Sequence, residues 1–359
     1  QSFVWRDPQF LGRRLDYVMS ADQSPGSRSY ALALSRPFYA SIVRQSLGFT
    51  GNYSEQDVAN YSGESFVGTV RRRHRELGVN YGVALGTSTH RNRRVKAGLM
   101  HQRRDFDRIP GAAYQGSLPN DEQRGFLQLG ADWESLDYIK ERHIQNFSRV
   151  EDYNLGFGVF PTLSWAPRLR MFDSTDSRLI PAITLRKGYR WRTGQLLMLR
   201  GSYSSLYTSG GNGNSIASLG AAYFVRGLPR QTLAFHTAYD HGWKRDPASS
   251  FFLGEANGLR GYGLAQFIGN RRFLFNIEDR IFVKDQLWRI IDVGAVVFFD
   301  SGNVWPARSG AQFTDLKNSV GLGLRLAPSR STANEPVRID LAYALSENRS
   351  RSRWSLSIL

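Results

Sequence analysis

The 359-residue sequence contains no cysteine, which excludes disulfide bonds and thiolate metal sites. Its six histidines lack a ligand spacing such as HExxH, so no structural zinc site is predicted. No run of 18 apolar residues is present, which excludes a conventional transmembrane helix. The opening residues, QSFVWRDPQF, lack the charged head and apolar core of a signal peptide. We therefore expect no metal or other cofactor.

Helical patterns are also scarce. No segment combines a helical apolar period with capping residues at its start. Proline (13 residues) is far rarer than glycine (35 residues), and aromatic residues make up 13% of the chain. Aromatic residues favour strands and glycine favours tight turns, so the composition favours an all-β protein. The length suits two or three ordinary domains or one large all-β body.

Acidic residues are outnumbered, because 31 Asp and Glu oppose 47 Lys and Arg, which gives a net charge of +16. Nucleic-acid binding rewards clustered basic residues, but here the arginines are spread along strands and turns, without an RNA-binding motif. We therefore expect no nucleic-acid partner. An anionic membrane surface, an anionic cargo and a merely solvated surface all stay open.

The dominant hydrophobic period is two. In 232–240, Leu233, Phe235 and Tyr239 fall on one face and polar residues on the other, as in a half-buried strand, and 319–326 alternates in the same way. Turns rich in Gly, Pro, Asn and Ser separate such segments. The sequence predicts sixteen strands, at 13–22, 28–37, 43–54, one within 64–89, 93–105, 124–140, 152–166, 179–192, 195–208, 215–226, 231–243, 271–283, 288–302, 319–327, 337–346 and 351–359.

One stretch, 61–90, allows two assignments. It contains FVGTVRRRHR and NYGVALGTST, and either could be the sheet strand, with the other in an outer loop. The run RRRHR (71–75) suits binding of lipopolysaccharide phosphates or a solvated loop.

Sixteen amphipathic strands suit either soluble sandwiches or a membrane barrel. The polar faces are rich in Arg, Asp, Glu, Gly and Ser, as in a barrel interior. Long links (106–123 and 244–270) alternate with short ones (192–195 and 283–288), as on the two sides of a bilayer. Aromatic residues sit near strand ends, as in interface girdles: Tyr189, Trp191, Tyr207, Trp243, Trp305 and Trp354. We predict an all-β, sixteen-stranded antiparallel transmembrane β-barrel over 13–359.

The glycine-rich stretch GLRGYG (258–263) holds the main candidate site. Parity on the two following strands places Glu278 and Asp300 on the inward faces. The link 244–270 is long enough to fold back into the lumen, where Arg260 could pair with both carboxylates. The alternative is an external loop with a solvated arginine and two unrelated acids.

These motifs carry a family resemblance. The LRGY tetrapeptide (259–262), the pattern N-x-E-x-R at 276–280 and the pattern F-x-D-x-G at 298–302 resemble the C-terminal region of the BamA/TamA superfamily of outer-membrane insertases and translocators. The opening DPQFLGRR (7–14) and the later RPF (36–38) resemble its first strands. Five predicted strands follow the loop, as in that family. The resemblance implies a bacterial-type outer membrane, with residues 1–12 as a lead-in from the periplasm.

The resemblance also implies a site and a mechanism. A long extracellular loop would fold into the lumen, braced by Leu259, Arg260, Gly261 and Tyr262 against Glu278 and Asp300. Other proteins would be inserted or translocated at a lateral seam between the first and last strands, at Leu15, Tyr17, Trp354, Leu356 and Ile358.

The same resemblance suggests partners and leaves alternatives. Implied partners are outer-membrane lipid, lipopolysaccharide, client proteins, and periplasmic POTRA domains or accessory subunits. Two features depart from the family, since no POTRA domain is visible and the ending WSLSIL lacks the usual terminal aromatic. No catalytic triad, nucleophile elbow or phosphate loop is present, so we expect no enzymatic activity. The alternatives are a two-partner-secretion-type or passive channel, and a membrane anchor for a missing N-terminal domain.

Overall fold

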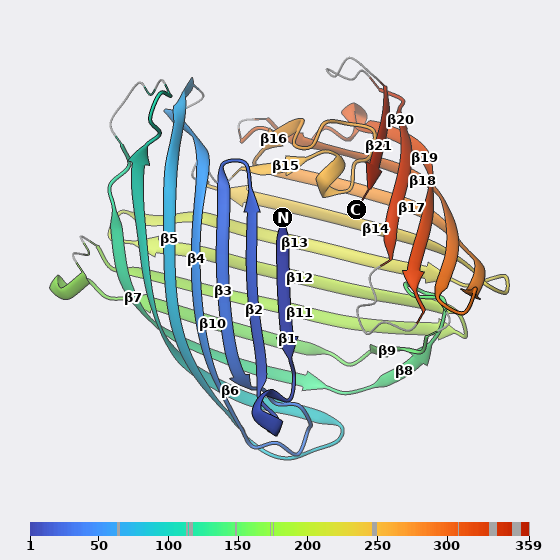
Figure 1. Ribbon diagram of the computed structural model, residues 1–359, viewed down its shortest axis with the longest axis horizontal. Helices are drawn as coiled ribbons and strands as arrows, with labels where there is room; N and C mark the ends of the chain where they lie inside the picture. The colour runs from blue at the N-terminus through green and yellow to red at the C-terminus, as the bar shows by residue number, and fades with distance from the viewer. Residues whose placement is uncertain are drawn as a thin grey trace.

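In a computed structural model, the chain forms one large antiparallel sheet and two small hairpins (Figure 1). The structure describes residues 1–62, 65–112, 114, 118–147, 149–172, 174, 176–245, 250–307, 309–329, 336–346 and 353–358. Within these ranges there is no α-helix, only short 3-10 turns. None of the helices in the described part of the chain is long and apolar enough to cross a membrane.

The large sheet has seventeen strands, and each pairs antiparallel with its neighbours. Two small hairpins interrupt the sequence order, β8–β9 (Tyr138–Glu141 and Glu151–Asn154) and β15–β16 (Phe251–Leu253 and Phe267–Gly269). The strands of the large sheet are, in order, β1 (Ser2–Asp7), β2 (Asp16–Ser24), β3 (Ser27–Arg36), β4 (Gln45–Ser62), β5 (Ser65–Ala84), β6 (Arg91–Arg108), β7 (Glu122–Ser135), β10 (Gly158–Ala166), β11 (Arg178–Arg192), β12 (Gln195–Thr208), β13 (Gly211–Val225), β14 (Gln231–Trp243), β17 (Arg271–Leu287), β18 (Ile291–Trp305), β19 (Lys317–Pro328), β20 (Val337–Ala344) and β21 (Trp354–Ile358).

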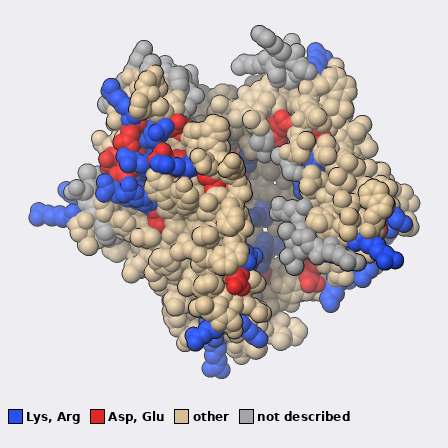
Figure 2. Space-filling view, in the orientation of Figure 1, with Lys and Arg blue, Asp and Glu red and all other residues tan. Residues whose placement is uncertain are grey.

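The sheet curls round on itself, and its two end strands, β1 and β21, come to the same side of the molecule (Figure 1). Among the described residues, no pairing joins these two strands. The surface is hollowed between the two ends of the sheet (Figure 2). The two long links at 109–121 and 244–270 lie at one end of the strands, which we call the loop end, and the short turns 193–194 and 288–290 lie at the opposite, turn end.

The exposure of side chains is the reverse of that in a soluble protein. On the outer face of the sheet, Leu77, Val79 and Leu99 are 54%, 49% and 67% exposed. On the inner face, Asp300 and Asp340 are fully buried. Apolar residues outside and polar residues inside are the arrangement of a transmembrane barrel, in which lipid covers the outer face.

The prediction of sixteen strands is one short. The strands from β2 to β21 in the large sheet each overlap one predicted range, but β1 falls within the predicted lead-in, 1–12. Phe3, Val4 and Trp5 are consecutive apolar residues, so this segment has no period of two to reveal a strand. The two assignments for 61–90 are both too narrow, since β5 contains all of the first candidate stretch and the first half of the second in one long strand.

Candidate functional site

The loop between β14 and β17 packs on the inner face of the sheet. The hairpin β15–β16 and the 3-10 turn Glu255–Asn257 lie in its described part. The side chains of Leu253, Leu259 and Tyr262 are fully buried beside Val304 and Ala344. The Tyr262 hydroxyl donates to the carbonyl oxygen of Asn318 at 2.8 Å. We call residues 244–270 the arginine loop.

Glycine at position 261 allows the loop to approach the wall. Its φ of +89° lies in the left-handed region, which side chains rarely tolerate. A Cβ at this position would lie 3.2 Å from the backbone nitrogen of Ala344 in β20. The turn therefore places the neighbouring Arg260 directly against the inner wall.

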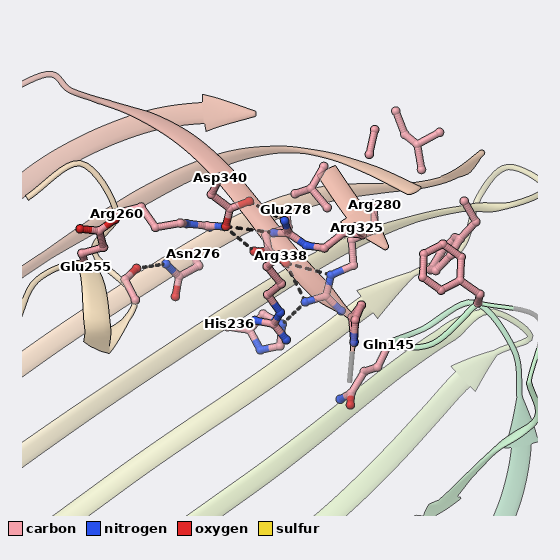
Figure 3. Close-up of a pocket in the computed structure, with 17 residues that line it drawn as sticks. Gln145, His236, Glu255, Arg260, Asn276, Glu278, Arg280, Arg325, Arg338 and Asp340 are labelled. Atoms are coloured by element: carbon pink, nitrogen blue, oxygen red, sulfur yellow. Dashed lines mark hydrogen bonds and ion pairs between the residues drawn. The ribbon is translucent and has the colours of Figure 1, made fainter. Parts of the chain in front are cut away.

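Arg260 is bound on three sides. Its Nε and Nη2 donate to the two carboxylate oxygens of Asp300 at 2.8 and 2.7 Å, a bidentate pair. Its Nη1 lies 2.9 Å from Glu278 Oε1 and 3.2 Å from Asp340 Oδ2. The guanidinium also lies 3.4 Å from the ring centre of Phe298. Figure 3 shows the side chain of Arg260 pointing toward that of Asp340.

The structure brings together the predicted loop residues, but it adds an acid that the prediction missed. Asp340 on β20 binds Arg260 and also accepts from Arg325 on β19. Its place on the polar face of 337–345 is readable from parity. Its proximity to Arg260 depends on strand register, which parity does not give. Arg260 therefore ties together β17, β18 and β20.

A second segment, residues 136–157, packs on the inner face from the turn end. Ile144 is fully buried against Leu196, Phe224 and Ala234. The backbone carbonyls of this segment accept hydrogen bonds from the wall: Arg226 Nη1 to Arg142 O at 2.8 Å, Thr232 Oγ1 to His143 O, Arg280 Nη1 to Ile144 O at 3.0 Å, and Lys187 Nζ to Leu155 O at 2.8 Å. We call it the second inserted segment.

The segment is also ordered internally. The carboxylate of Glu151 accepts the amides of Ile144, Gln145 and Asn146 at 3.0 to 3.1 Å. His143 packs 5.0 Å from Phe282, ring centre to ring centre. Burial lowers the pKa of His143 below its ordinary value. The imidazole is therefore neutral at neutral pH.

Glu278 connects the two inserted parts of the chain. One carboxylate oxygen binds Arg260 of the arginine loop. The other lies 2.7 Å from Arg280 Nη2, and Arg280 holds Ile144 of the second inserted segment. A cavity of about 490 Å³ lies between the two parts, lined by Gln145, His236, Arg260, Glu278, Arg325 and Arg338 among others (Figure 3).

The predicted seam residues divide into two groups. Trp354, Leu356 and Ile358 lie on β21, which within the described ranges pairs only with β20, and they are 59 to 69% exposed. Leu15 precedes β2, and Tyr17 lies in β2 between β1 and β3. The additional strand β1 occupies the N-terminal edge of the sheet, so Tyr17 lies one strand in from that edge, and the seam itself stays a prediction.

The part of the chain that the structure describes contains no group of three His, Cys, Asp or Glu placed to hold a metal ion. The inner wall instead offers guanidinium–carboxylate pairs, whose chemistry is binding and bracing.

Comparison with known proteins agrees with this architecture. The family model of the Omp85 superfamily domain matches residues 9–358. The fold is similar to that of BamA from Haemophilus ducreyi lacking POTRA domains 1-3, with a TM-score of 0.51 and 12% identity over 99% of this chain and 65% of that one. It is also similar to CdiB from Escherichia coli, with a TM-score of 0.52 and 13% identity over 99% and 57%. The chain thus spans less than two thirds of the length of either protein. No curated protein matches it.

Proposed function

The chain belongs to the Omp85 superfamily of bacterial outer-membrane barrels, and from this premise we propose that it inserts or translocates other proteins at a lateral seam between β1 and β21. The observation that carries the proposal is the pair of sheet edges, since β1 pairs only with β2 and β21 only with β20 within the described residues. In this role the protein is not an enzyme, and the loop end faces outward.

An unpaired strand edge offers a row of N–H and C=O groups to another chain. The last strand is also weakly held, because β21 and β20 share five register positions, whereas β18 and β19 share twelve. At 0.5–1.5 kcal/mol for each ladder hydrogen bond, releasing β21 costs roughly 3–8 kcal/mol. A client strand that pairs with the freed edge offsets this cost.

The arginine loop limits which part of the wall moves. Arg260 binds acids on β17, β18 and β20, and Gly261 packs against the backbone of β20. The ion pairs of Arg260 thus end on β20, the strand next to β21. The brace therefore holds the wall as far as β20 and leaves the last strand free to separate.

The test is a covalent lock across the seam. The natural chain has no cysteine, so Val4→Cys and Leu356→Cys introduce the only thiols, and a bismaleimide can join them. The assay is insertion of an outer-membrane client barrel into liposomes that contain the protein. The joined protein is expected to lose activity and the unjoined double variant to keep it.

The matched control joins Met19→Cys and Leu32→Cys, which face each other on the paired strands β2 and β3. This lock should leave activity unchanged. Full insertion activity with the seam joined would refute the proposal.

A two-partner-secretion-type channel is the second candidate, supported by the similarity to CdiB. In that case the interior conducts, and the two inserted parts of the chain are plugs. A large, stable single-channel conductance in planar bilayers, combined with normal activity of the seam-locked protein, would favour the channel.

A further inference from the structure

The outer face of the sheet carries a cluster of charged side chains that belongs neither to the proposed seam nor to the ion pairs of Arg260. Figure 2 shows basic and acidic side chains gathered on the face formed by β4–β6. The arginines of this cluster, which we call the outer arginine patch, are Arg28 on β3, Arg71, Arg73 and Arg75 on β5, and Arg103 on β6.

Strand geometry divides the basic run 71–75 between two faces. Arg71, Arg73 and Arg75 share the outer face of β5 with Leu77 and other exposed apolar residues. Arg72 faces inward, where it donates to Gln56 at 2.8 Å. The run is therefore neither a solvated loop nor a uniformly charged strand, because it presents three guanidinium groups in one row.

The patch begins where the apolar band ends. A strand advances about 3.3 Å per residue, so Arg75 lies about 7 Å beyond Leu77 along β5. Across the sheet, Arg75 pairs in register with Tyr53, which in turn faces Tyr30 with ring centres 6.1 Å apart. Tyrosines at this level mark the boundary between lipid tails and headgroups. The arginines beyond it lie at headgroup depth, towards the loop end.

Three carboxylates of the cluster, Glu55, Asp57 and Asp105, are less exposed than their arginine partners, and Asp107 is the exception, at 44% beside 34% for Arg73. The side chains of Arg28 and Arg103 are 51% and 45% exposed, whereas their partners Glu55 and Asp105 are 14% and 8% exposed. The acids thus position the guanidinium groups, whose outer N–H groups stay available. Arg75 is exposed and pairs with no carboxylate in the described part of the chain. Beside the row, Arg28, Glu55 and Arg71 line a hollow of about 260 Å³.

We propose that the outer arginine patch binds the phosphate groups of a phosphorylated glycolipid of the outer leaflet, with the acyl chains lying on the apolar rows of β3–β6. The assignment rests on the orientation in the proposed function, in which the loop end faces outward. Arginine suits this ligand because its planar fork donates two parallel hydrogen bonds to phosphate oxygens. The apolar rows beyond Tyr53, with Leu47, Phe49, Leu77 and Leu99 exposed, supply the contact for the acyl chains.

The experiment measures binding of bis-phosphorylated lipid A to the detergent-solubilised, delipidated protein by native mass spectrometry. Arg71→Gln, Arg73→Gln and Arg75→Gln combined should weaken binding at least about tenfold, because three charge-assisted contacts are lost. Arg75→Gln alone disturbs no ion pair with a described carboxylate, so it tests the patch without risk to folding, and it should weaken binding about threefold or more. The matched control, Arg72→Gln, lies on the same strand but faces inward and should bind as the natural protein does.

Two further lipids identify the recognised group. Dephosphorylated lipid A should bind much more weakly, and phosphatidylglycerol should not compete at equal concentration. Equal binding by the triple variant, or by dephosphorylated lipid A, would overturn the assignment, and effective competition by phosphatidylglycerol would show a general anionic surface instead. No client is present in this assay, so joining β1 to β21 should leave lipid binding unchanged. The lipid-binding proposal and the seam proposal can therefore be refuted independently.

Discussion

Replacing Arg260 with alanine removes the cation from a buried acid. Asp300 is fully buried, and in the variant it would keep only the amide of residue 260 at 3.2 Å and Asn276 Nδ2 at 2.7 Å. The other two acids each keep a second arginine partner, because Glu278 keeps Arg280 and Asp340 keeps Arg325. The penalty therefore falls mainly on Asp300.

The free energy that the docked loop loses follows from the contacts that Asp300 keeps. Breaking a buried ion pair by removing one partner costs about 3–5 kcal/mol, and two remaining hydrogen bonds to Asp300 place this case near 3 kcal/mol. Each 1.4 kcal/mol is a tenfold change, so the arginine loop should open about 10²-fold more often. The buried side chains of Leu259 and Tyr262 still favour the docked loop, so the barrel itself should stay folded.

Hydrogen exchange of the loop is the suitable assay. The amide of Leu259 donates to Gly254 O within the loop, and its exchange should accelerate by about the same factor. Lys317→Ala is a control, because it removes a pair whose partner, Asp315, is largely exposed. The double variant Arg260→Ala, Asp300→Ala should recover much of the loss, since no buried carboxylate is then unpaired. Unchanged exchange in Arg260→Ala, or strictly additive effects in the double variant, would refute the reasoning.

The second inserted segment supports two further predictions. Arg280→Met removes the donor to Ile144 O, so the segment should loosen and the single-channel conductance in planar bilayers should rise severalfold; an unchanged conductance would contradict a sealing role. Burial lowers the pKa of His143, so the unfolded segment binds more protons and docking weakens as the pH falls below about 6.5. Conductance should therefore rise between pH 7.5 and pH 5.5, and His143→Asn, which tolerates the positive φ at this position, should remove that dependence.

The sequence predicted those features of the candidate site that depend only on residues close together in the chain. Parity placed Glu278 and Asp300 on the inner face, and the glycines around Arg260 marked a loop able to approach it. Both predictions use only neighbours along the chain. Asp340 needed the register between strands that are far apart in sequence, and register is set by packing and turn geometry.

The second inserted segment was missed for a different reason. The predicted strands 124–140 and 152–166 extended into both ends of this segment, whereas in the structure Tyr138–Glu141 and Glu151–Asn154 form the separate hairpin β8–β9. The segment's contacts with the wall are made largely by backbone carbonyls of Arg142, His143 and Ile144, which every residue type possesses. Only the fold decides which arginine meets them. The basic run 71–75 shows the converse, because its meaning became clear once it was placed on a strand and its alternate residues separated.

The number of strands also constrains direction at the seam. In an antiparallel sheet of seventeen strands, the first and the last point the same way, so β1 and β21 could join each other only in parallel. A single strand that enters between them and runs oppositely would complete antiparallel ladders on both sides. The two edges thus favour a guest that runs in the direction of β2 and β20. A guest strand of reversed direction would form parallel ladders on both sides, which are slightly less stable per residue.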